Sequence, residues 1–346
     1  MSADGSTPVP LEAVSLAGHE GHLTGAQEEA LKDFKRQLEE KGYFQPAKEG
    51  EEASHPDVEL LRFLRARKFD VPGAYAQFTS AEDWRKNEKV AELYDNFPLD
   101  EFEQARSLYP QFTGRRDNAG LPVYVFKVGA LSKEQTDEYV KVDNKRLEQR
   151  MVALYEHMVQ FVLPFSSAIP HAHQETPISG CATIVDISNV SLRRFWQLKD
   201  HMQRASTLAT ARYAETLGAI YLVGAPGFFS VVWGWIKKWF DPGTVDKIHI
   251  LPSSPAQVTA ILTAHMPLSS IPKAYGGELD WDFGAAGPAL DEPAQQTLGR
   301  KDCPAGPVRW LREGKASIVG QGRDEVLEKE ASAEGLAKQL DETKLE

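Results

Sequence analysis

The sequence contains very little cysteine: Cys181 and Cys303 are the only two among 346 residues. Two cysteines cannot build the disulfide framework of a small secreted domain, and Cys181 stands in a run of apolar residues. The first eight residues also lack the basic region and apolar core of a secretory signal peptide. A reducing, cytoplasmic setting is therefore expected.

Acidic residues outnumber basic ones. Lysine and arginine number 39 against 50 for aspartate and glutamate, which gives a formal net charge of −11. This balance argues against nucleic acid as a partner and provides no general attraction to anionic membranes. Any contact with a membrane must therefore be local and hydrophobic. The hydrophobic content of 42% and the length are ordinary for a globular chain of two units with tails.

The sequence also lacks the common motifs of α/β enzymes. It has no Gly-x-Gly-x-x-Gly after a predicted strand, no phosphate-binding P-loop and no Gly-x-Ser-x-Gly nucleophile elbow. His171 and His173 could ligate a metal, but their Pro-flanked stretch offers no clear third ligand, so a solvated loop is favoured. Asp186 ends a predicted strand and could be a catalytic acid, although a turn or capping role is favoured. We expect no enzyme activity and no cofactor.

The N-terminal third of the chain has helical periodicity. Residues 1–24 are polar and without period, and we predict that they are disordered. Three amphipathic segments follow, which predict helices over residues 26–42, 55–68 and 74–86. They predict a small all-α unit over residues 25–95.

The next part of the chain alternates between strand and helix patterns, from residue 96 to 285. Four such alternations predict an α/β domain built on a mainly parallel sheet. Residues 286–346 are rich in Gly and Pro and then in acidic residues, and they are predicted to form a mobile or loosely docked tail. The predicted strands are 123–128, 181–186, 219–223 and 245–251, and the predicted helices are 146–163, 192–213, 228–240 and 255–265.

Residues 218–236 are free of charge and long enough to resemble a transmembrane span. Pro226 stands near the middle of this stretch, inside Gly224-Ala-Pro-Gly227, and would break a continuous helix. The stretch is therefore interpreted as a strand, a turn and a helix.

The predicted helix over residues 228–240 is apolar over more than half of its circumference. It holds six aromatic residues, among them three of the seven tryptophans of the chain. A helix packed on one sheet needs an apolar stripe of roughly 100°. The remaining apolar surface must contact another element, a bound lipid or a membrane. Only Ser230, Gly234, Lys237 and Lys238 interrupt it.

Several motifs in this order resemble the CRAL-TRIO lipid-binding family, and within it the fungal phosphatidylinositol/phosphatidylcholine transfer proteins of the secretory pathway. The most specific is Leu60-Leu-Arg-Phe-Leu-Arg-Ala-Arg-Lys-Phe-Asp70. The others are Tyr109-Pro-Gln111, Gly120-Leu-Pro-Val-Tyr124, Thr183-Ile-Val-Asp186, Phe240-Asp-Pro-Gly-Thr-Val-Asp-Lys-Ile248 and Tyr275-Gly-Gly277. The resemblance covers residues 26–285.

The resemblance implies a helical unit beside an α/β domain whose sheet forms the floor of an apolar pocket for one phospholipid. It also implies that residues 228–240 form a gate helix that closes the pocket and opens at membranes. Acyl chains and the bilayer would then contact its surplus apolar surface in turn. The gate residues would be Phe228, Phe229, Val232, Trp233, Trp235, Ile236, Trp239 and Phe240. Alternatively, these aromatic residues form ordinary core.

By the same resemblance, recognition of the phosphatidylinositol headgroup falls on five residues. Lys247 and Arg67 would neutralise the phosphodiester, while Glu215 and Thr244 would hydrogen-bond to inositol hydroxyls. Asp246 is a weaker member of the set. An ion pair between the two domains is the alternative role for Arg67.

A second headgroup site is implied less completely. Tyr124 and Thr183 match the family, and Cys181 stands where the family has serine. Phe112 and Thr113 stand where a second tyrosine is expected. Losing a tyrosine weakens a cation–π cage for choline, and a thiol donates a weaker hydrogen bond than a hydroxyl. The sequence therefore favours phosphatidylinositol over phosphatidylcholine as a ligand.

The resemblance implies a monomeric transfer protein that exchanges one phospholipid at Golgi, endosomal or endoplasmic reticulum membranes without covalent chemistry. It would support phosphoinositide signalling and vesicle traffic, either by transfer or by presenting lipid to a kinase. Two alternatives stay open: a carrier of another hydrophobe, such as a sterol, a tocopherol-like molecule or haem, and an α/β enzyme that acts on lipids.

Overall fold

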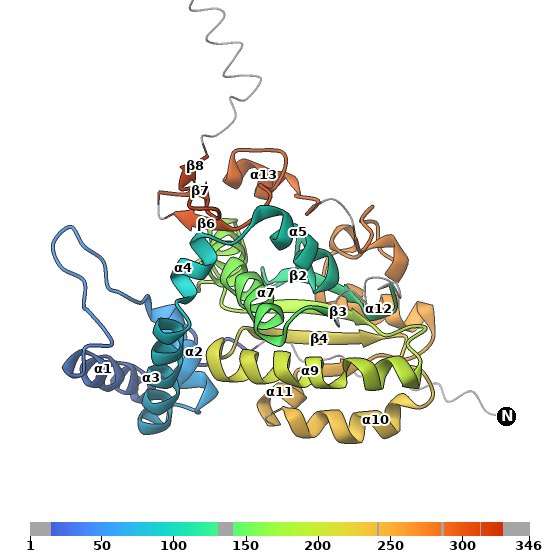
Figure 1. Cartoon of the computed structure of the whole chain (residues 1–346), viewed down its shortest axis with the longest axis horizontal. Helices are drawn as coiled ribbons and strands as arrows, with labels where there is room; N and C mark the ends of the chain where they lie inside the picture. Colours follow the sequence, from blue (N-terminus) through green and yellow to red (C-terminus); the bar gives the residue numbers. More distant parts are fainter. Residues whose placement is uncertain (1–14, 131–140, 241, 285–286, 312, 328–346) are drawn as a thin grey trace, which may run out of the picture.

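A computed structural model provides the architecture of the chain (Figure 1). It describes residues 15–130, 141–240, 242–284, 287–311 and 313–327. Three helices stand together at one end of the molecule, a five-stranded sheet with its helices occupies the centre, and a second small sheet lies at the C-terminal end of the described chain (Figure 1).

The N-terminal helices form a unit with its own core. The helices are α1 (Gly25–Glu40), α2 (Asp57–Ala66) and α3 (Val71–Asn87). The ring of Phe78 on α3 meets Phe34 of α1 and Phe63 of α2 edge to face, with centroids 5.8 and 5.0 Å apart. This arrangement confirms the predicted helices.

The segment immediately before α1 is ordered, which corrects the predicted disorder for residues 15–24. Thr24 caps α1 by accepting a hydrogen bond from the backbone N–H of Gln27, whose side chain bonds back to Thr24. Thr176 of the α/β part donates to the carbonyl oxygen of Glu20 at 2.9 Å. Contacts made far along the chain order this polar segment, which has no hydrophobic period of its own. Residues 1–14 lie outside the described part of the chain.

The central sheet has strands in the order β1-β2-β3-β4-β5. Strands β2 to β5 are parallel, which confirms the predicted fold class, and β1 runs antiparallel to β2 at the edge. The sequence analysis did not identify β1. The strands span Gln111–Arg116, Pro122–Lys127, Cys181–Asp186, Leu217–Val223 and Ile248–Ile250.

Helices connect the parallel strands. Between β2 and β3, the predicted helix 146–163 is observed as α7, a π-helical turn η2 and α8 in direct succession. The helix α9 connects β3 to β4, while α10, η3 and α11 connect β4 to β5. In order, the elements are α4 (Val90–Asp95), α5 (Leu99–Leu108), η1 (Val128–Ala130), α7 (Asn144–His157), η2 (Met158–Val162), α8 (Leu163–Ala168), α9 (Leu192–Arg212), α10 (Phe229–Ile236), η3 (Lys237–Trp239), α11 (Pro242–Asp246), α12 (Pro255–His265), η4 (Leu268–Ser270) and η5 (Lys273–Tyr275).

The charge-free stretch 218–236 is β4, a turn and α10, as predicted. No helix within the described ranges is both long and apolar enough to cross a bilayer. The predicted strand 245–251 is wrong at its start, because α11 continues to Asp246 and only Ile248–Ile250 pair with β4. Proline opens α11 at a position that suits its fixed φ, so Val245 lies in a helix despite its β-branched side chain.

The part of the chain after residue 286 contains elements that the sequence analysis missed. They are α13 (Glu292–Leu298) and a three-stranded antiparallel sheet of β6 (Val308–Leu311), β7 (Lys315–Ile318) and β8 (Glu325–Val326). The hydroxyl of Tyr94, itself fully buried, donates to the Val308 carbonyl at 2.8 Å and accepts from its N–H at 2.9 Å. This sheet is therefore tied to the body of the molecule.

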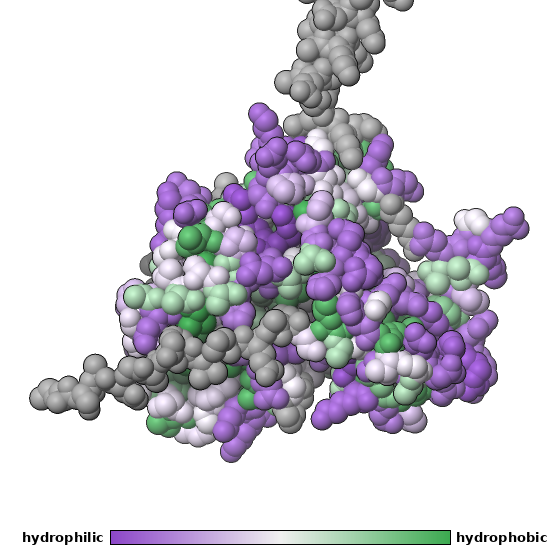
Figure 2. Space-filling view, turned by 180° about the vertical axis from the view of Figure 1, so that it is seen from behind, coloured by the Kyte–Doolittle hydropathy of each residue, from purple (hydrophilic) through white to green (hydrophobic). Residues whose placement is uncertain are grey.

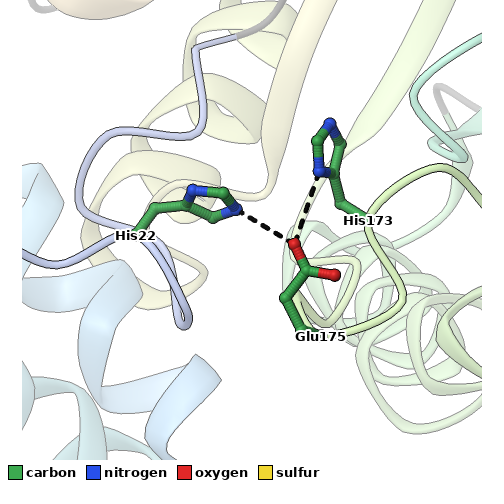
Figure 3. Close-up of side chains that lie close together, drawn as sticks. All are labelled: His22, His173 and Glu175. Carbon is green, nitrogen blue, oxygen red and sulfur yellow. Dashed lines mark ion pairs between the residues drawn. The ribbon is translucent and has the colours of Figure 1, made fainter.

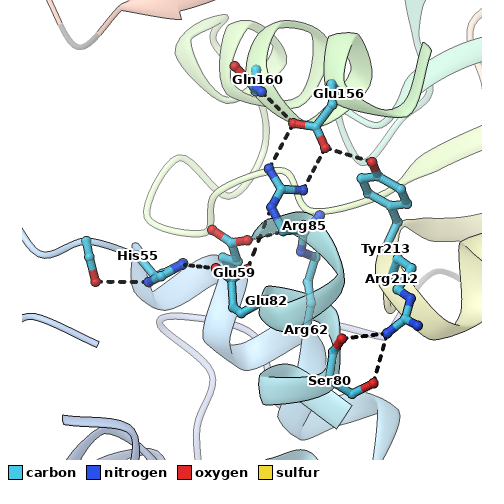
Figure 4. A network of polar contacts seen from close by, with 11 residues as sticks. His55, Glu59, Arg62, Ser80, Glu82, Arg85, Glu156, Gln160, Arg212 and Tyr213 are labelled. Carbon is cyan, nitrogen blue, oxygen red and sulfur yellow. Dashed lines mark hydrogen bonds and ion pairs between the residues drawn. The ribbon is translucent and has the colours of Figure 1, made fainter. Parts of the chain in front are cut away.

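A buried polar network joins the helical unit to the α/β domain (Figure 4). The carboxylate of Glu156, on α7, is fully buried and accepts two hydrogen bonds from Arg85 of α3, at 2.7 and 3.0 Å. The hydroxyl of Tyr213, at the end of α9, donates to the same carboxylate at 2.7 Å, and Gln160 also donates to it. One carboxylate thus connects three helices from both parts of the chain.

Candidate functional site

The strand register separates the sheet into a core face and a cavity face. Alternate residues of a strand point to opposite faces. Val125, Ile184 and Tyr221 are in register and belong to the main hydrophobic core. The row next to them consists of Tyr124, Thr183, Ile220 and Ile248, all paired in register, and all four line a large cavity.

The cavity has a volume of about 450 Å³ and a mainly apolar lining. This volume is within the range of small-molecule binding pockets. Its walls come from the sheet, α7, α9 and α10, and the end of α2 also reaches it. The two parts of the chain therefore build it together.

Charged side chains are concentrated where β4 and β5 begin. Lys247, just before β5, donates to the carboxylate of Glu215 at 2.7 Å and to the carbonyl oxygen of Leu217 at 2.9 Å. Glu215 has a φ of 54°, a left-handed conformation in the link between α9 and β4. Thr244 belongs to α11, and its carbonyl accepts a hydrogen bond from the N–H of Lys247. Glu215, Thr244 and Lys247 all line the cavity, so three predicted headgroup residues come together there.

Arg67, the fourth predicted headgroup residue, also lines the cavity. It caps the C-terminus of α2, where the chain turns tightly through Lys68 and Phe69, with φ values of 51° and 62°. The Phe69 N–H closes this turn by donating to the Leu64 carbonyl at 2.7 Å. Within the described ranges, Arg67 forms no ion pair, and its guanidinium donates a hydrogen bond to the carbonyl oxygen of neighbouring Ala66 at 3.4 Å. These contacts do not support the alternative of an interdomain ion pair.

Two predicted site residues lie elsewhere. Asp246 is exposed and is not among the residues that line the cavity. Thr113 is fully buried on β1, where its hydroxyl donates to the Val123 carbonyl at 2.9 Å. Because that hydroxyl is used within the sheet, Thr113 has a structural contact in place of the predicted headgroup contact.

The other second-lipid candidates do face the cavity. Tyr124, Thr183 and Cys181 line it, and the Cys181 sulfur lies 3.8 Å from the Thr183 hydroxyl. Burial raises the pKa of the Cys181 thiol to about 11, so it remains protonated at neutral pH. Phe112 packs against the ring of Tyr124, with centroids 5.8 Å apart, and does not itself line the cavity.

The segment α10–η3 forms one wall of the cavity. Five of the eight predicted gate residues line it, while Val232 is buried in the cluster that packs between α10 and the sheet. Trp235 is 46% exposed, and the side chain of Trp239, the eighth predicted gate residue, lies outside the described part of the structure. The five lining residues are Phe228, Phe229, Trp233, Ile236 and Phe240.

Exposed apolar side chains adjoin this wall. Trp196 of α9 and Trp235 of α10 lie ring to ring, with centroids 5.4 Å apart, and are 45% and 46% exposed. Leu192 and Val231 on the same two helices are 44% and 62% exposed. These four residues are called the apolar rim below. On the face of the molecule opposite to that of Figure 1, hydrophilic side chains predominate and hydrophobic ones form separate small areas (Figure 2).

Gln77 is a cavity residue that was not predicted from the sequence. This residue of α3 lines the cavity, and only 8% of its surface is exposed to solvent. Its amide nitrogen donates to the Thr210 carbonyl at 2.9 Å, while its amide oxygen is buried without a hydrogen-bond partner in the described structure. The sequence does contain a signal for this residue, because a polar glutamine stands on the same buried face of α3 as Ala74, Phe78 and Ala81.

Asp186 has the turn role that the sequence favoured. One carboxylate oxygen accepts from the Ser188 N–H at 2.8 Å, and the other accepts from the Tyr275 hydroxyl at 3.1 Å. The carboxylate is buried and does not line the cavity.

Comparisons with known proteins agree with this architecture. The family model described as the CRAL/TRIO domain matches residues 106–277, and the model described as CRAL/TRIO, N-terminal domain, matches residues 30–80. The SEC14 cytosolic factor of Eremothecium gossypii is 33% identical over 275 residues, which cover 80% of this chain and 84% of that protein. The Sec14 cytosolic factor of Schizosaccharomyces pombe is 32% identical over 297 residues, which cover 84% and 98%.

A plant relative and a solved structure are also similar. The phosphatidylinositol/phosphatidylcholine transfer protein SFH7 of Arabidopsis thaliana is 31% identical over 217 residues, which cover 62% of this chain and 39% of that protein. The crystal structure of Sfh5 superposes with a TM-score of 0.53 at 15% identity, over 93% of this chain and 99% of that one. At this identity, the superposition indicates a shared fold.

Proposed function

The chain belongs to the CRAL/TRIO family, and we propose that it is a transfer protein that carries one phospholipid, phosphatidylinositol, and exchanges it at membranes for phosphatidylcholine or another lipid. One observation carries the proposal: Arg67, Glu215, Thr244 and Lys247 line the same apolar cavity. An apolar cavity suits acyl chains, and two cations suit a phosphodiester. Inositol hydroxyls can donate hydrogen bonds to the Glu215 carboxylate and accept one from the Thr244 hydroxyl.

The energetics of the proposal favour exchange over permanent capture. About 30 methylenes of a diacyl lipid at ~0.8 kcal/mol each give roughly 24 kcal/mol of transfer free energy out of water. The bilayer provides nearly the same stabilisation, so loading from a membrane is almost balanced. Selection among lipids then depends on the headgroup contacts, and the rate depends on access to the cavity.

In this proposal, the segment α10–η3 is the gate that controls access of lipids to the cavity. Its inner side chains contact the bound acyl chains, and its outer side contributes Trp235 and Val231 to the apolar rim. Tryptophan is enriched at membrane interfaces, and Lys237 and Lys238, both exposed, can reach lipid phosphates. The proposal includes transient contact of a cytoplasmic protein with Golgi, endosomal or endoplasmic reticulum membranes, and no covalent step.

A transfer assay tests the proposed function. Donor vesicles carry radiolabelled phosphatidylinositol or phosphatidylcholine, acceptor vesicles are unlabelled, and the purified full chain is added in catalytic amount. We expect label to move intact into the acceptor vesicles, with phosphatidylinositol transferred at the higher rate. Failure to move either lipid, together with a sterol, tocopherol or haem mass in native mass spectrometry, would establish the rival carrier function.

The gate has its own prediction. Placing carboxylates on the apolar rim, in the variant Val231→Asp/Trp235→Asp, is expected to lower the initial transfer rate roughly tenfold, because charged groups oppose entry into the interface by more than ~1.4 kcal/mol. Leu268→Asp is the matched control, since Leu268 is 42% exposed and does not line the cavity. Equal rates for the two variants at equal lipid occupancy would contradict a gate at this position.

A further inference from the structure

Three metal-ligating side chains meet away from the cavity (Figure 3). His22 precedes α1, while His173 and Glu175 belong to the loop between α8 and β3. The sequence analysis considered His171 and His173 as ligands and found no third. The described structure leaves His171 outside the group and brings His22 and Glu175 to His173.

The geometry of the group fits a small divalent cation. The Nε2 atom of His22 and the Nδ1 atom of His173 each lie 3.4 Å from the same oxygen, Oε1 of Glu175. In a tetrahedral zinc site with bonds of about 2.0–2.1 Å, neighbouring ligand atoms are separated by about 3.3–3.4 Å. All three ligand atoms lie within 4.8 Å of one another. A modest rotation of the half-exposed His173 ring therefore brings its Nδ1 atom to the spacing that a zinc site needs from the Nε2 atom of His22.

The backbones that carry these side chains are held together independently of them. The Thr176 hydroxyl donates to the Glu20 carbonyl at 2.9 Å, and Thr176 is only 4% exposed. Gly21 lies so close to the loop that a Cβ atom there would be 3.1 Å from Cγ of Glu175. Glycine thus permits the close approach that places His22 opposite Glu175.

One nitrogen in the group lies at ion-pair distance from Glu175 but forms no hydrogen bond. The His22 Nε2 atom is shielded from solvent, points toward Glu175 and has no hydrogen-bond partner in the described structure. A buried polar atom without a hydrogen bond is costly, and coordination of a cation would satisfy it.

We propose that His22, His173 and Glu175 form a binding site for one divalent transition metal ion of the Zn²⁺ class, with water as the fourth ligand. Two imidazoles favour borderline cations such as Zn²⁺ and Co²⁺ over Mg²⁺ and Ca²⁺, which prefer oxygen ligands. The ion links the segment before α1 to the loop before β3, so its role is to fasten the N-terminal segment to the lipid-binding domain. The inference does not depend on the proposed function.

The test uses the full chain without a polyhistidine tag, treated with chelator and then freed of it. Zn²⁺ is titrated in a calorimeter, and Co²⁺ binding is followed by its visible absorption. We expect one equivalent of either ion to bind, tetrahedral Co²⁺ bands to appear, and Zn²⁺ to raise Tm by a few degrees, while Mg²⁺ does none of these.

The variants separate this site from chance binding by other histidines. His22→Ala and His173→Ala are expected to weaken Zn²⁺ binding at least a hundredfold and to abolish the rise in Tm, and Glu175→Gln is expected to weaken binding at least tenfold. His171→Ala is the matched control in the same loop and is expected to bind like the wild type. Zn²⁺ binding by His22→Ala with wild-type affinity, or a wild type that binds no Zn²⁺, would overturn the proposal.

Discussion

Replacing Lys247 with alanine is expected to lower phosphatidylinositol transfer roughly a hundredfold. The ammonium group at this position lines the cavity and is the natural partner of a phosphodiester. A hydrogen bond to a charged group contributes about 1.5–3 kcal/mol, and each 1.4 kcal/mol corresponds to a factor of ten in affinity. The substitution also leaves the part-buried Glu215 carboxylate without its 2.7 Å partner, which adds repulsion toward an anionic lipid.

The transfer of phosphatidylcholine serves as the internal control for this prediction. Its zwitterionic headgroup does not require the same cation, so its transfer by Lys247→Ala is expected to change by less than a factor of about three. Lys273→Ala is the matched variant, because Lys273 is 61% exposed, pairs with Asp280 and does not line the cavity. Unchanged phosphatidylinositol transfer by Lys247→Ala would show that the headgroup site is elsewhere.

Replacing Glu156 with alanine is expected to destabilise the protein by about 3–5 kcal/mol, because it removes the buried carboxylate that pairs with Arg85 and accepts hydrogen bonds from Tyr213 and Gln160. Arg85, whose side chain is 28% exposed, keeps a longer ion pair with Glu82 at 3.6 Å, whereas the Tyr213 hydroxyl and Gln160 lose their shared acceptor. Such a loss is a large part of the 5–15 kcal/mol that stabilises a typical protein. Urea unfolding followed by circular dichroism measures it.

The control for this loss is an ion pair at the surface. Glu29 pairs with Lys32 at 2.7 Å, but both side chains are about 70% exposed. Glu29→Ala is therefore expected to cost less than about 0.5 kcal/mol. A similar small cost for Glu156→Ala would contradict a structural role for the buried network.

The same carboxylate predicts a pH dependence of stability. Burial raises the pKa of Glu156, but attraction to Arg85 and the hydrogen bonds from Arg85, Tyr213 and Gln160 outweigh it and hold the pKa below its usual value. A lowered pKa in the folded state stabilises the protein above the unfolded value of about 4.3, and this stabilisation is lost as pH falls below it. In Glu156→Gln, the decrease in the free energy of unfolding between pH 5 and pH 3 is therefore expected to be smaller.

The fold was largely predictable because its elements carry local signals. The apolar runs that became β3 and β4 and the helical period of α9 each fit one secondary structure. The segment of β5 did not fit one secondary structure, because the β-branched residues Thr244 and Val245 lie in α11 and only pairing with β4 decides where the strand begins. The three-stranded sheet after α13 was missed since Gly and Pro dominate the preceding stretch.

The site was predictable where a residue faces the cavity through a regular element. Thr183 and Tyr124 follow the period of their strands, whereas Thr113 lies on a strand with an irregular register and turns its hydroxyl to Val123. The proximity of His22 to His173 had no sequence signal, because it depends on contacts between segments about 150 residues apart. Separation in the sequence, more than residue type, limited the prediction.

The ion pair between Lys247 and Glu215 has a consequence for what the cavity can hold. The charges of Lys247 and Glu215 cancel, so the pair itself presents a dipole to the cavity. In the proposed exchange, the anionic headgroup of phosphatidylinositol competes with Glu215 for the ammonium and releases the carboxylate to the inositol hydroxyls. A neutral or zwitterionic lipid can leave the pair closed. In that exchange, Glu215 serves as a built-in counter-ion of Lys247, so that lipids of different charge alternate in one cavity without leaving the Lys247 charge unpaired.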